Sequence, residues 1–269
     1  MIIISTIKLI FGDCLQRMDE LIKQNINIDA IITDIPYGTT NCKWDSVIPF
    51  DEMWKRLKLL KTKNTPIILF GSEPFSSALR MSNIKNYKYD WYWYKNQPSG
   101  ALNAKKQPMR AIENICVFYS NQCLYNPQMI ERTEEELKRL SKKSTYTSSS
   151  EIYNNHWTNT RNRNDNKLKY PNNVLEIKTV FNRSKEKLPH PNQKPVELMK
   201  YLVETYTKEN DTILDFTMGS GTTSIACIKT NRNFIGIEND DTYFDVCKNR
   251  VNTYINDNNL QDANVEIAE

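Results

Sequence analysis

Residues 211–223 have the sequence DTILDFTMGSGTT, and this stretch predicts how the chain folds. Residues 211–216 form an apolar run typical of a buried strand, and residues 222–228 are typical of a helix. Between them, Gly219 and Gly221 permit positive φ and a close approach of the backbone to a ligand. Because a helix N-terminus presents unpaired N–H groups, the turn can bind an anionic part of a small molecule.

A second part of this site is the predicted strand at residues 234–237, which ends at Glu238, 17 residues after Gly221. An acid at this place in a βαβ unit accepts hydrogen bonds from ribose hydroxyls. Ser224 stands where a dinucleotide fingerprint has its third glycine, and the absence of a lysine after the turn excludes a Walker loop. An adenosine-containing ligand without a pyrophosphate fits best, and S-adenosylmethionine is the obvious one. A tight turn without a ligand is the alternative.

Short apolar runs alternate with amphipathic stretches, as in βαβ units and a largely parallel sheet. The predicted strands are residues 7–11, 28–33, 66–70, 87–94, 114–119, 211–216 and 234–237. The predicted helices are residues 15–22, 50–60, 74–81, 196–206, 222–228 and 243–251. We expect a long polar loop between the strands at 87–94 and 114–119, and a loose polar tail from residue 252 onward.

The predicted strand at residues 28–33 is followed by Asp34, Ile35, Pro36 and Tyr37, at the sheet edge where α/β proteins bind ligands. The amino group of a nucleobase is a poor nucleophile because its lone pair is delocalised into the ring. The Asp34 carboxylate and the Ile35 carbonyl can each accept one N–H bond and direct that lone pair toward a methyl group. Pro36 biases Ile35 toward an extended backbone, and Tyr37 offers a face for stacking. A turn that closes a buried strand is the alternative.

Composition and charge indicate a folded cytoplasmic protein with a local basic segment. Hydrophobic residues make up 39% of the 269 residues, charged residues 25%, and the net charge is +4. Residues 141–190 carry ten Lys and Arg residues against four Asp and Glu residues, interleaved with aromatic side chains, as in surfaces that bind nucleic acids. A solvated insertion is the alternative. No apolar run suits a membrane span, and six cysteines without a CxxC pair predict neither a metal site nor disulfides.

The two motifs together resemble the amino-methyltransferases of DNA, in the permuted arrangement that places the catalytic motif before the cofactor motif. The catalytic pattern of that family is Asp, Asn or Ser followed by Pro-Pro-Tyr, and this chain matches it at Asp34, Pro36 and Tyr37. Ile35 departs from the pattern, but the family uses this position through its backbone carbonyl, so the role is expected to survive.

The cofactor turn of that family has the form Asp-Pro-Phe-x-Gly-Ser-Gly-Thr-Thr. Phe216 and Thr217 stand where Pro-Phe is usual, and the matched residues are Asp215, Gly219, Ser220, Gly221, Thr222 and Thr223. Residues 190–195, HPNQKP, resemble the segment before the helix that flanks the methionine part of the cofactor. Gly12-Asp13 resembles the acid near the adenine ring.

The resemblance implies an α/β fold, the Rossmann-like class I methyltransferase fold, with a mixed seven-stranded sheet and a circularly permuted motif order. It assigns residues 1–124 to the catalytic part of this domain, 125–189 to a basic target-recognition insertion, 190–252 to the cofactor-binding part and 253–269 to a C-terminal tail. The strand at 7–11 is expected beside that at 234–237, which would bring Asp13 and Glu238 to one cofactor.

The activity implied by the resemblance is methyl transfer from S-adenosylmethionine to N6 of a flipped-out adenine in double-stranded DNA. An Asp in the first motif position resembles mostly the adenine enzymes. The expected catalytic residues are Asp34, Ile35, Pro36 and Tyr37. The expected cofactor-binding residues are Asp13, Lys194, Asp215, Phe216, Gly219, Gly221, Thr222, Thr223 and Glu238. The expected DNA contacts are Lys43, Lys95, Lys105, Arg161, Arg163, Lys167 and Lys169. A cognate restriction endonuclease and a second copy of the chain are the protein partners considered.

Several other functions remain open from the sequence. N4-methylation of cytosine uses the same mechanism, whereas C5-methylation is excluded because no proline precedes a cysteine. A methyltransferase-like DNA-binding module without activity is a second alternative. Methylation of RNA or of a protein glutamine, which usually involves Asn-Pro-Pro-Tyr, is a third. A nicotinamide oxidoreductase would explain neither Asp34 to Tyr37 nor Ser224.

Overall fold

The computed structural model describes residues 5–40, 42, 45–141, 167–181, 184, 186–260 and 264–268. The chain divides into two units, which are described separately here. The first contains Met1–Asn126 and Asn173–Glu269, and the second contains Pro127–Asn172. The boundaries of the second unit fall within the segment predicted to be a basic insertion, while residues 173–189 belong to the first unit.

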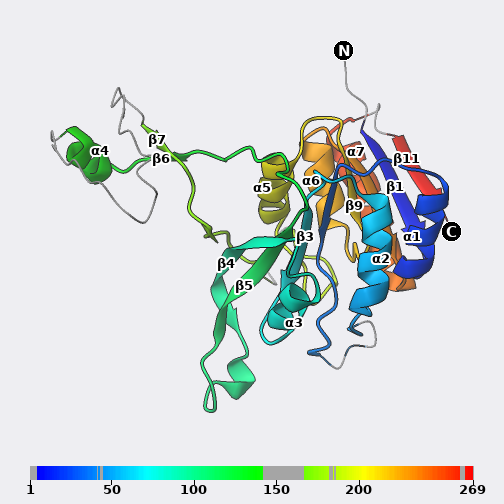
Figure 1. Cartoon of the computed structure of the whole chain (residues 1–269), viewed down its shortest axis with the longest axis horizontal. Coiled ribbons are helices and arrows are strands. Elements are labelled where there is room, and N and C mark those ends of the chain that lie inside the picture. Colours follow the sequence, from blue (N-terminus) through cyan, green and yellow to red (C-terminus); the bar gives the residue numbers. More distant parts are fainter. Residues whose placement is uncertain are drawn as a thin grey trace. The chain divides into compact units, whose positions relative to one another are not determined.

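The first unit is built on one mixed sheet of nine strands among the described residues (Figure 1). In spatial order these are β11 (Asn264–Ala268), β1 (Thr6–Phe11), β10 (Asn233–Glu238), β9 (Thr212–Asp215), β2 (Ala30–Thr33), β3 (Ile67–Gly71), β5 (Arg110–Phe118), β4 (Tyr87–Ser99) and β8 (Val174–Leu175). All neighbouring pairs are parallel except those of β5 with β3 and with β4. The pairing of β1 with β10 is the one expected from the sequence and places Phe11 opposite Glu238.

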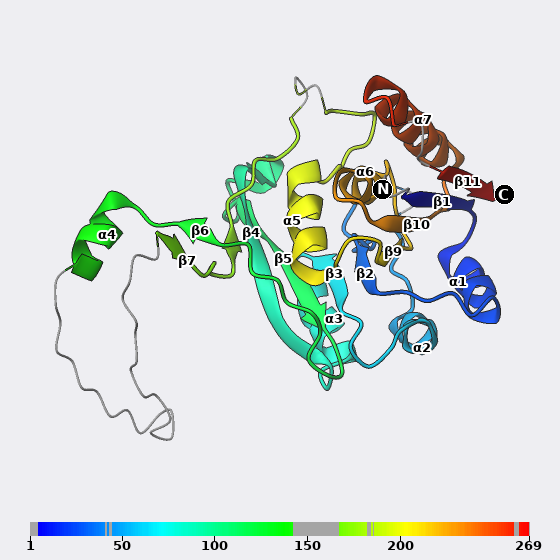
Figure 2. The same ribbon diagram turned by 90° about the horizontal axis from the view of Figure 1, so that it is seen from above.

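Helices cover both faces of this sheet (Figure 2). One face packs against α1 (Cys14–Lys23), α2 (Phe50–Leu60) and α3 (Phe75–Ser82), and the other against α5 (Val196–Tyr206), α6 (Thr222–Lys229) and α7 (Asp241–Asp257). In β2, Ala30 and Ile32 belong to one apolar core and Ile31 to the other, because side chains alternate along a strand. β2 is thus buried on both faces and ends at Thr33, so Asp34 is the first residue beyond the carboxyl end of this strand.

The expected count of seven strands falls short by the two edge strands, β11 and β8. The loose tail was also wrong, since α7 continues to Asp257 and β11 pairs in parallel with β1. Without β11 the edge of β1 would expose unpaired backbone groups. Because β11 is held by backbone hydrogen bonds, its sequence does not need the apolar pattern from which a strand is predicted. Val265 of β11 additionally packs against the core.

The expected long polar loop between residues 94 and 114 is instead a continuous hairpin. β4 extends to Ser99, which pairs with Arg110 of β5, and a short 3-10 turn, η1 (Ala101–Asn103), closes it. The polar sequence did not predict these strand residues, because the outer half of the hairpin is solvent-exposed and is stabilised by backbone pairing.

The second unit has a small two-stranded sheet, β6 (Ile130–Glu131) with β7 (Leu168–Lys169), and one helix, α4 (Glu134–Ser141), within its described part. Thr133 and Glu136 form reciprocal side-chain to backbone hydrogen bonds of 3.3 and 3.0 Å at the start of α4, which is a capping box. In neither unit do the described residues include a helix long and apolar enough to cross a membrane.

Candidate active site

Both sequence motifs line one cavity of about 690 Å³ in the first unit. Asp34 to Tyr37 follow β2, the glycine turn follows β9, and Glu238 ends β10, so the parallel strands bring these residues to the same sheet edge. Gly12 and Asp13 after β1, and residues 190–194 before α5, complete the wall on the side of the glycine turn. The cavity therefore joins the predicted catalytic and cofactor motifs.

The glycine turn has the backbone conformation that its sequence predicts. Gly219 and Gly221 have φ values of +52° and +72°. A Cβ on Gly221 would lie 2.3 Å from the Cys247 sulfur, so α7 packs against the turn too closely for any side chain. Ser220 lies in the turn and Thr222 is the first residue of α6. Neither backbone N–H group donates a hydrogen bond to an acceptor among the described residues. The turn can therefore donate hydrogen bonds to a ligand.

We expect Gly221→Ala to destabilise the protein by about 2–4 kcal/mol, from left-handed backbone strain together with the clash against Cys247. Thermal unfolding should show a loss of several degrees. Gly100→Ala is the matched control, since Gly100 also has positive φ, +93°, but open space around its Cβ position. Equal losses in the two variants would contradict the close packing of α7 on the turn.

Asp215 holds the glycine turn from inside. Its carboxylate accepts hydrogen bonds from the hydroxyls of Thr33, at 2.6 Å, and Thr223, at 2.5 Å. Burial raises its pKa to about 6. Phe216 is fully buried beneath the turn, and Thr222 and Thr223 are buried in the first turn of α6. Of these expected cofactor residues, Asp215 and Thr223 therefore stabilise the glycine turn through the hydrogen bond between their side chains.

Glu238 and Asp13 lie at the ends of neighbouring strands. One Glu238 oxygen accepts from the Gly219 N–H at 2.8 Å, the other from the N–H groups of Asn239 and Asp240, both at 2.9 Å. Burial raises the pKa of Glu238. Asp13 caps α1 by accepting at one oxygen from the Leu15 and Gln16 N–H groups, 3.0 Å each. Both acids border the cavity.

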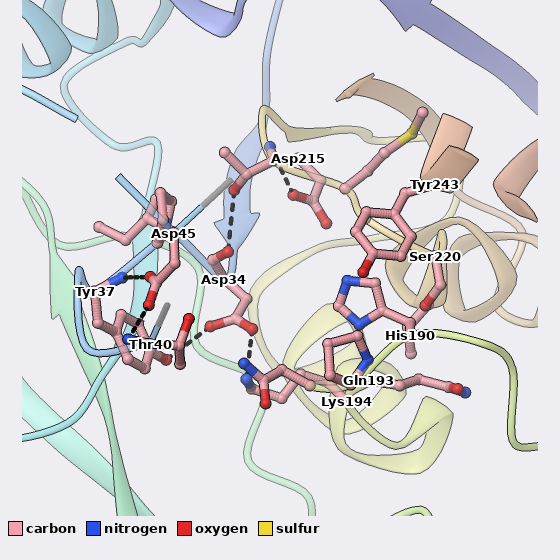
Figure 3. A pocket seen from close by; sticks show the side chains of 18 of the residues that line it. Asp34, Tyr37, Thr40, Asp45, His190, Gln193, Lys194, Asp215, Ser220 and Tyr243 are labelled. Carbon is pink, nitrogen blue, oxygen red and sulfur yellow. Dashed lines mark hydrogen bonds and ion pairs between the residues drawn. The ribbon is translucent and has the colours of Figure 1, made fainter. Parts of the chain in front are cut away.

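The catalytic loop is fixed by Asp45, a residue to which the sequence assigned no such role. Its two carboxylate oxygens accept four backbone N–H bonds of 2.6–2.9 Å from the consecutive residues Tyr37, Gly38, Thr39 and Thr40 (Figure 3). Burial acts to raise its pKa, but hydrogen bonds from Thr40, Gly38 and Thr39 hold that pKa below the usual range. Asp45 thus stays ionised and clamps the loop.

The backbone of the catalytic loop is also tied to the glycine turn. The Thr217 hydroxyl donates to the Asp34 carbonyl at 3.1 Å and lies 2.7 Å from the Thr33 hydroxyl. Thr217 stands at a position where the resembled family usually has a phenylalanine. The Ile35 side chain is buried, and no donor among the described residues reaches the Ile35 carbonyl.

Asp34 lies in a network of buried charges (Figure 3). Its Oδ2 accepts from Lys194 Nζ at 2.5 Å and its Oδ1 from the Tyr37 hydroxyl at 2.7 Å. Lys194 also pairs with Glu113 of β5 at 3.0 Å, and the side chains of Lys194 and Glu113 are only 9% and 10% exposed. Burial raises the pKa of Asp34; Lys194 opposes this shift and Glu113 adds to it.

Lys194, expected among the cofactor contacts, lines the cavity, and its contact with the cofactor stays a prediction. Its ammonium lies between Asp34 and Glu113, and although burial disfavours its charge, these carboxylates raise its pKa above the usual value. Lys95 of β4 also pairs with Glu113, at 3.6 Å, and its side chain is only 12% exposed. Lys95 also lines the cavity, and its contact with DNA stays a prediction.

Tyr37 presents less free surface than the sequence suggested. Its ring stacks on Phe75 of α3 with centroids 5.1 Å apart and an interplanar angle of 29°. One face is thus covered by the protein itself, and its hydroxyl is engaged with Asp34 and Glu113.

The other expected DNA contacts are lysine and arginine residues spread over several segments of the chain. Lys105 is exposed on the β4–β5 hairpin. In the second unit, Lys167 is exposed, whereas Lys169 pairs with Glu136 at 2.7 Å. Lys43, Arg161 and Arg163 lie outside the described residues.

The sequence analysis missed Glu113, the contact of Thr217 with Asp34, and the role of Asp45 in fixing the loop, since Asp45 was expected only as a residue that could close over the flipped base. A charged residue two positions before the apolar run of residues 115–118 is the signal that could have indicated Glu113. An acid shortly after a Pro- and Gly-containing loop is the corresponding signal for Asp45. For Thr217, the departure from the Pro-Phe pattern was noted, but nothing in the sequence indicated its contact with Asp34.

The fold and the paired motifs define an S-adenosylmethionine-type Rossmann-like methyltransferase, and three comparisons agree with this class. A family model described as DNA methylase, N6_N4_Mtase, matches residues 28–249. The type II methyltransferase M.HpaI of Haemophilus parainfluenzae is 26% identical over 264 residues, covering 93% of this chain and 75% of the relative. A crystal structure of an M1.HpyAVI-SAM complex superposes with a TM-score of 0.62 at 26% identity, covering 91% of this chain and 99% of the other.

A more distant structure shares the fold alone. The PvuII DNA methyltransferase, described as cytosine-N4-specific, has a TM-score of 0.61 at 14% identity and covers 98% of this chain and 95% of the other. The chain belongs to the N6/N4 family of DNA methylases. The resemblance stated from the sequence, the fold class and the use of S-adenosylmethionine by the family are confirmed.

Proposed function

We propose that this enzyme methylates N6 of adenine in double-stranded DNA, with Asp34 and Ile35 orienting the amino group of a flipped-out base. The observation that carries the proposal is the shared cavity, in which Asp34 lies beside a turn tied to it through Thr217. An amino group bound at Asp34 therefore lies near a ligand held by Gly219 and Glu238.

The residues of the glycine turn fit S-adenosylmethionine. The Gly221 backbone admits no side chain, and the N–H groups of Ser220 and Thr222 face no protein acceptor among the described residues. Glu238 carries a buried carboxylate for ribose hydroxyls, and Asp13 stands on the adjoining wall. When bound there, the cofactor supplies an electrophilic methyl group on its sulfonium.

The chain itself makes the amino group of the base nucleophilic. The Asp34 carboxylate and the Ile35 carbonyl accept the two N–H bonds, so the lone pair points away from the ring and toward the methyl group. Asp45 fixes the loop through four backbone N–H groups, which is the preorganisation such a reaction needs. No covalent enzyme intermediate is required.

Adenine is favoured over cytosine because an Asp occupies the first position of the catalytic motif. N4-methylation of cytosine is the alternative, and a relative fold described as cytosine-N4-specific keeps it open. The test is nucleoside analysis of unmethylated DNA after reaction with labelled S-adenosylmethionine. N6-methyldeoxyadenosine supports the proposal, while N4-methyldeoxycytidine would retain the mechanism and overturn the choice of base.

Recognition of DNA is proposed for the second unit and the β4–β5 hairpin. Lys105 and Lys167 are exposed cations that can contact phosphates. The basic excess of residues 141–190 supports the same role. Because M.HpaI is described as a type II methyltransferase, we further propose a place in a restriction-modification system, with a cognate endonuclease recognising the same site.

A further inference from the structure

One carboxylate oxygen faces both hydrogen-bond donors of Asp34. Glu113 Oε1 lies 3.0 Å from the Tyr37 hydroxyl and 3.0 Å from Lys194 Nζ. These two groups are also the donors to Asp34, at 2.7 and 2.5 Å. Glu113 comes from β5 and Asp34 from the loop after β2, so two elements far apart in sequence converge on the same pair of donors.

This sharing matters because both Asp34 oxygens are already engaged. A tyrosine hydroxyl has one proton, so Tyr37 donates to Asp34 or to Glu113 but not fully to both. Lys194 has three N–H bonds and reaches both carboxylates at once. Each Asp34 oxygen can accept a second hydrogen bond, but a base amino group that approaches along the direction now occupied by Tyr37 or Lys194 displaces that donor. The displaced donor then needs another acceptor, since leaving it unpaired in a largely buried site costs about 1–3 kcal/mol.

We propose that Glu113 is a positioning residue that accepts the hydrogen bonds of Tyr37 and Lys194 when the amino group of the target base binds Asp34. The inference rests on the proposed function, because it requires a base at Asp34. Rotation of the Tyr37 hydroxyl about its C–O bond is enough to change acceptor, since the two distances differ by so little.

The surrounding charges suit this exchange. The ionisable groups around Asp34 are Lys194 from the segment before α5, Glu113 from β5, Tyr37 from its own loop and Asp215 at the end of β9. Lys95 of β4 pairs with the outer oxygen of Glu113 at 3.6 Å. Burial disfavours the charged form of Glu113, yet Lys194 and Lys95 hold its pKa below the usual range, so it remains an acceptor at neutral pH.

The test is Glu113→Gln, assayed for DNA methylation in the full-length enzyme. We expect kcat to fall about 10-fold, because the neutral amide keeps one acceptor oxygen but accepts more weakly from Tyr37 and Lys194, with the KM for S-adenosylmethionine unchanged. The acid limb of the pH profile should move to lower pH, because Asp34 loses a like-charged neighbour and keeps Lys194. Glu204→Gln, on a partly exposed carboxylate of α5, is the control and should change neither quantity.

A merely structural role for Glu113 would change stability but leave kcat at the wild-type value, because the loss of charge moves the acid limb in either case. Wild-type kcat in Glu113→Gln would therefore overturn the inference, whereas failure of the wild-type enzyme to methylate DNA would overturn the proposed function instead. If Glu113→Gln does not fold, Glu113→Asp is the deciding variant. It keeps the negative charge but moves the carboxylate away from Tyr37 and Lys194, so kcat should fall while the acid limb stays in place. Wild-type kcat in this variant would refute the role of Glu113.

Discussion

Replacing Asp34 by alanine should reduce methyl transfer to DNA by at least about 100-fold while leaving cofactor affinity unchanged. The variant removes the carboxylate that orients the amino group, an interaction of the kind whose loss costs 10²–10³ in rate. The glycine turn is supported by Asp215 and Glu238, so S-adenosylmethionine binding does not depend on the Asp34 side chain. Single-turnover transfer of labelled methyl and calorimetric titration with the cofactor measure the two effects separately.

The fold should survive this change, because Lys194 keeps Glu113 as a partner at 3.0 Å. Asp34→Asn serves as the matched variant: it retains one acceptor oxygen but loses the charge, and we expect an intermediate rate. If Asp34→Ala transferred methyl groups at the wild-type rate, the catalytic assignment would be wrong.

Replacing Lys194 by methionine should destabilise the protein by about 3 kcal/mol at pH 8, because the buried Glu113 carboxylate and the partly buried Asp34 carboxylate lose the cation between them. Their pKa values in the folded state should then rise. A group whose folded pKa lies above its unfolded value contributes stability that is lost as pH rises through the folded pKa. The deficit relative to the wild type should therefore be larger at pH 8 than at pH 5.

Urea denaturation at both pH values measures this deficit. Lys200→Met is the control, since Lys200 meets Glu204 only at 4.0 Å where both side chains are about a third exposed, and it should change stability by less than about 0.5 kcal/mol at either pH. An equal deficit for Lys194→Met at pH 5 and pH 8 would show that the carboxylates are not electrostatically dependent on Lys194.

The sequence predicted the central elements well because their signals are local. The helix at residues 196–206 coincides with α5, and the glycines of the turn adopt the positive φ that only their lack of a side chain makes easy. The parallel pairing of β1 with β10 also followed from the resemblance. The helix and the turn depend on periodicity and backbone conformation, which a single sequence records, whereas the strand pairing depended on the family resemblance.

The features that were missed depend on contacts between distant segments. Glu113 reaches Asp34 only because β5 inserts antiparallel beside β3, and Lys194 reaches both from the segment before α5. No spacing in the sequence connects residues 34, 113 and 194. Likewise, the pairing of β11 with β1 is a backbone interaction between the two ends of the chain, and its short strand resembles a polar tail.

The most direct test of the account is a methylation assay of the wild-type enzyme with labelled S-adenosylmethionine. Unmethylated double-stranded DNA, RNA and protein are supplied as acceptors in separate reactions. The account predicts that label enters the DNA, at an exocyclic amino group. Label in RNA or in a protein glutamine, with DNA unlabelled by an enzyme that still binds the cofactor, would contradict it.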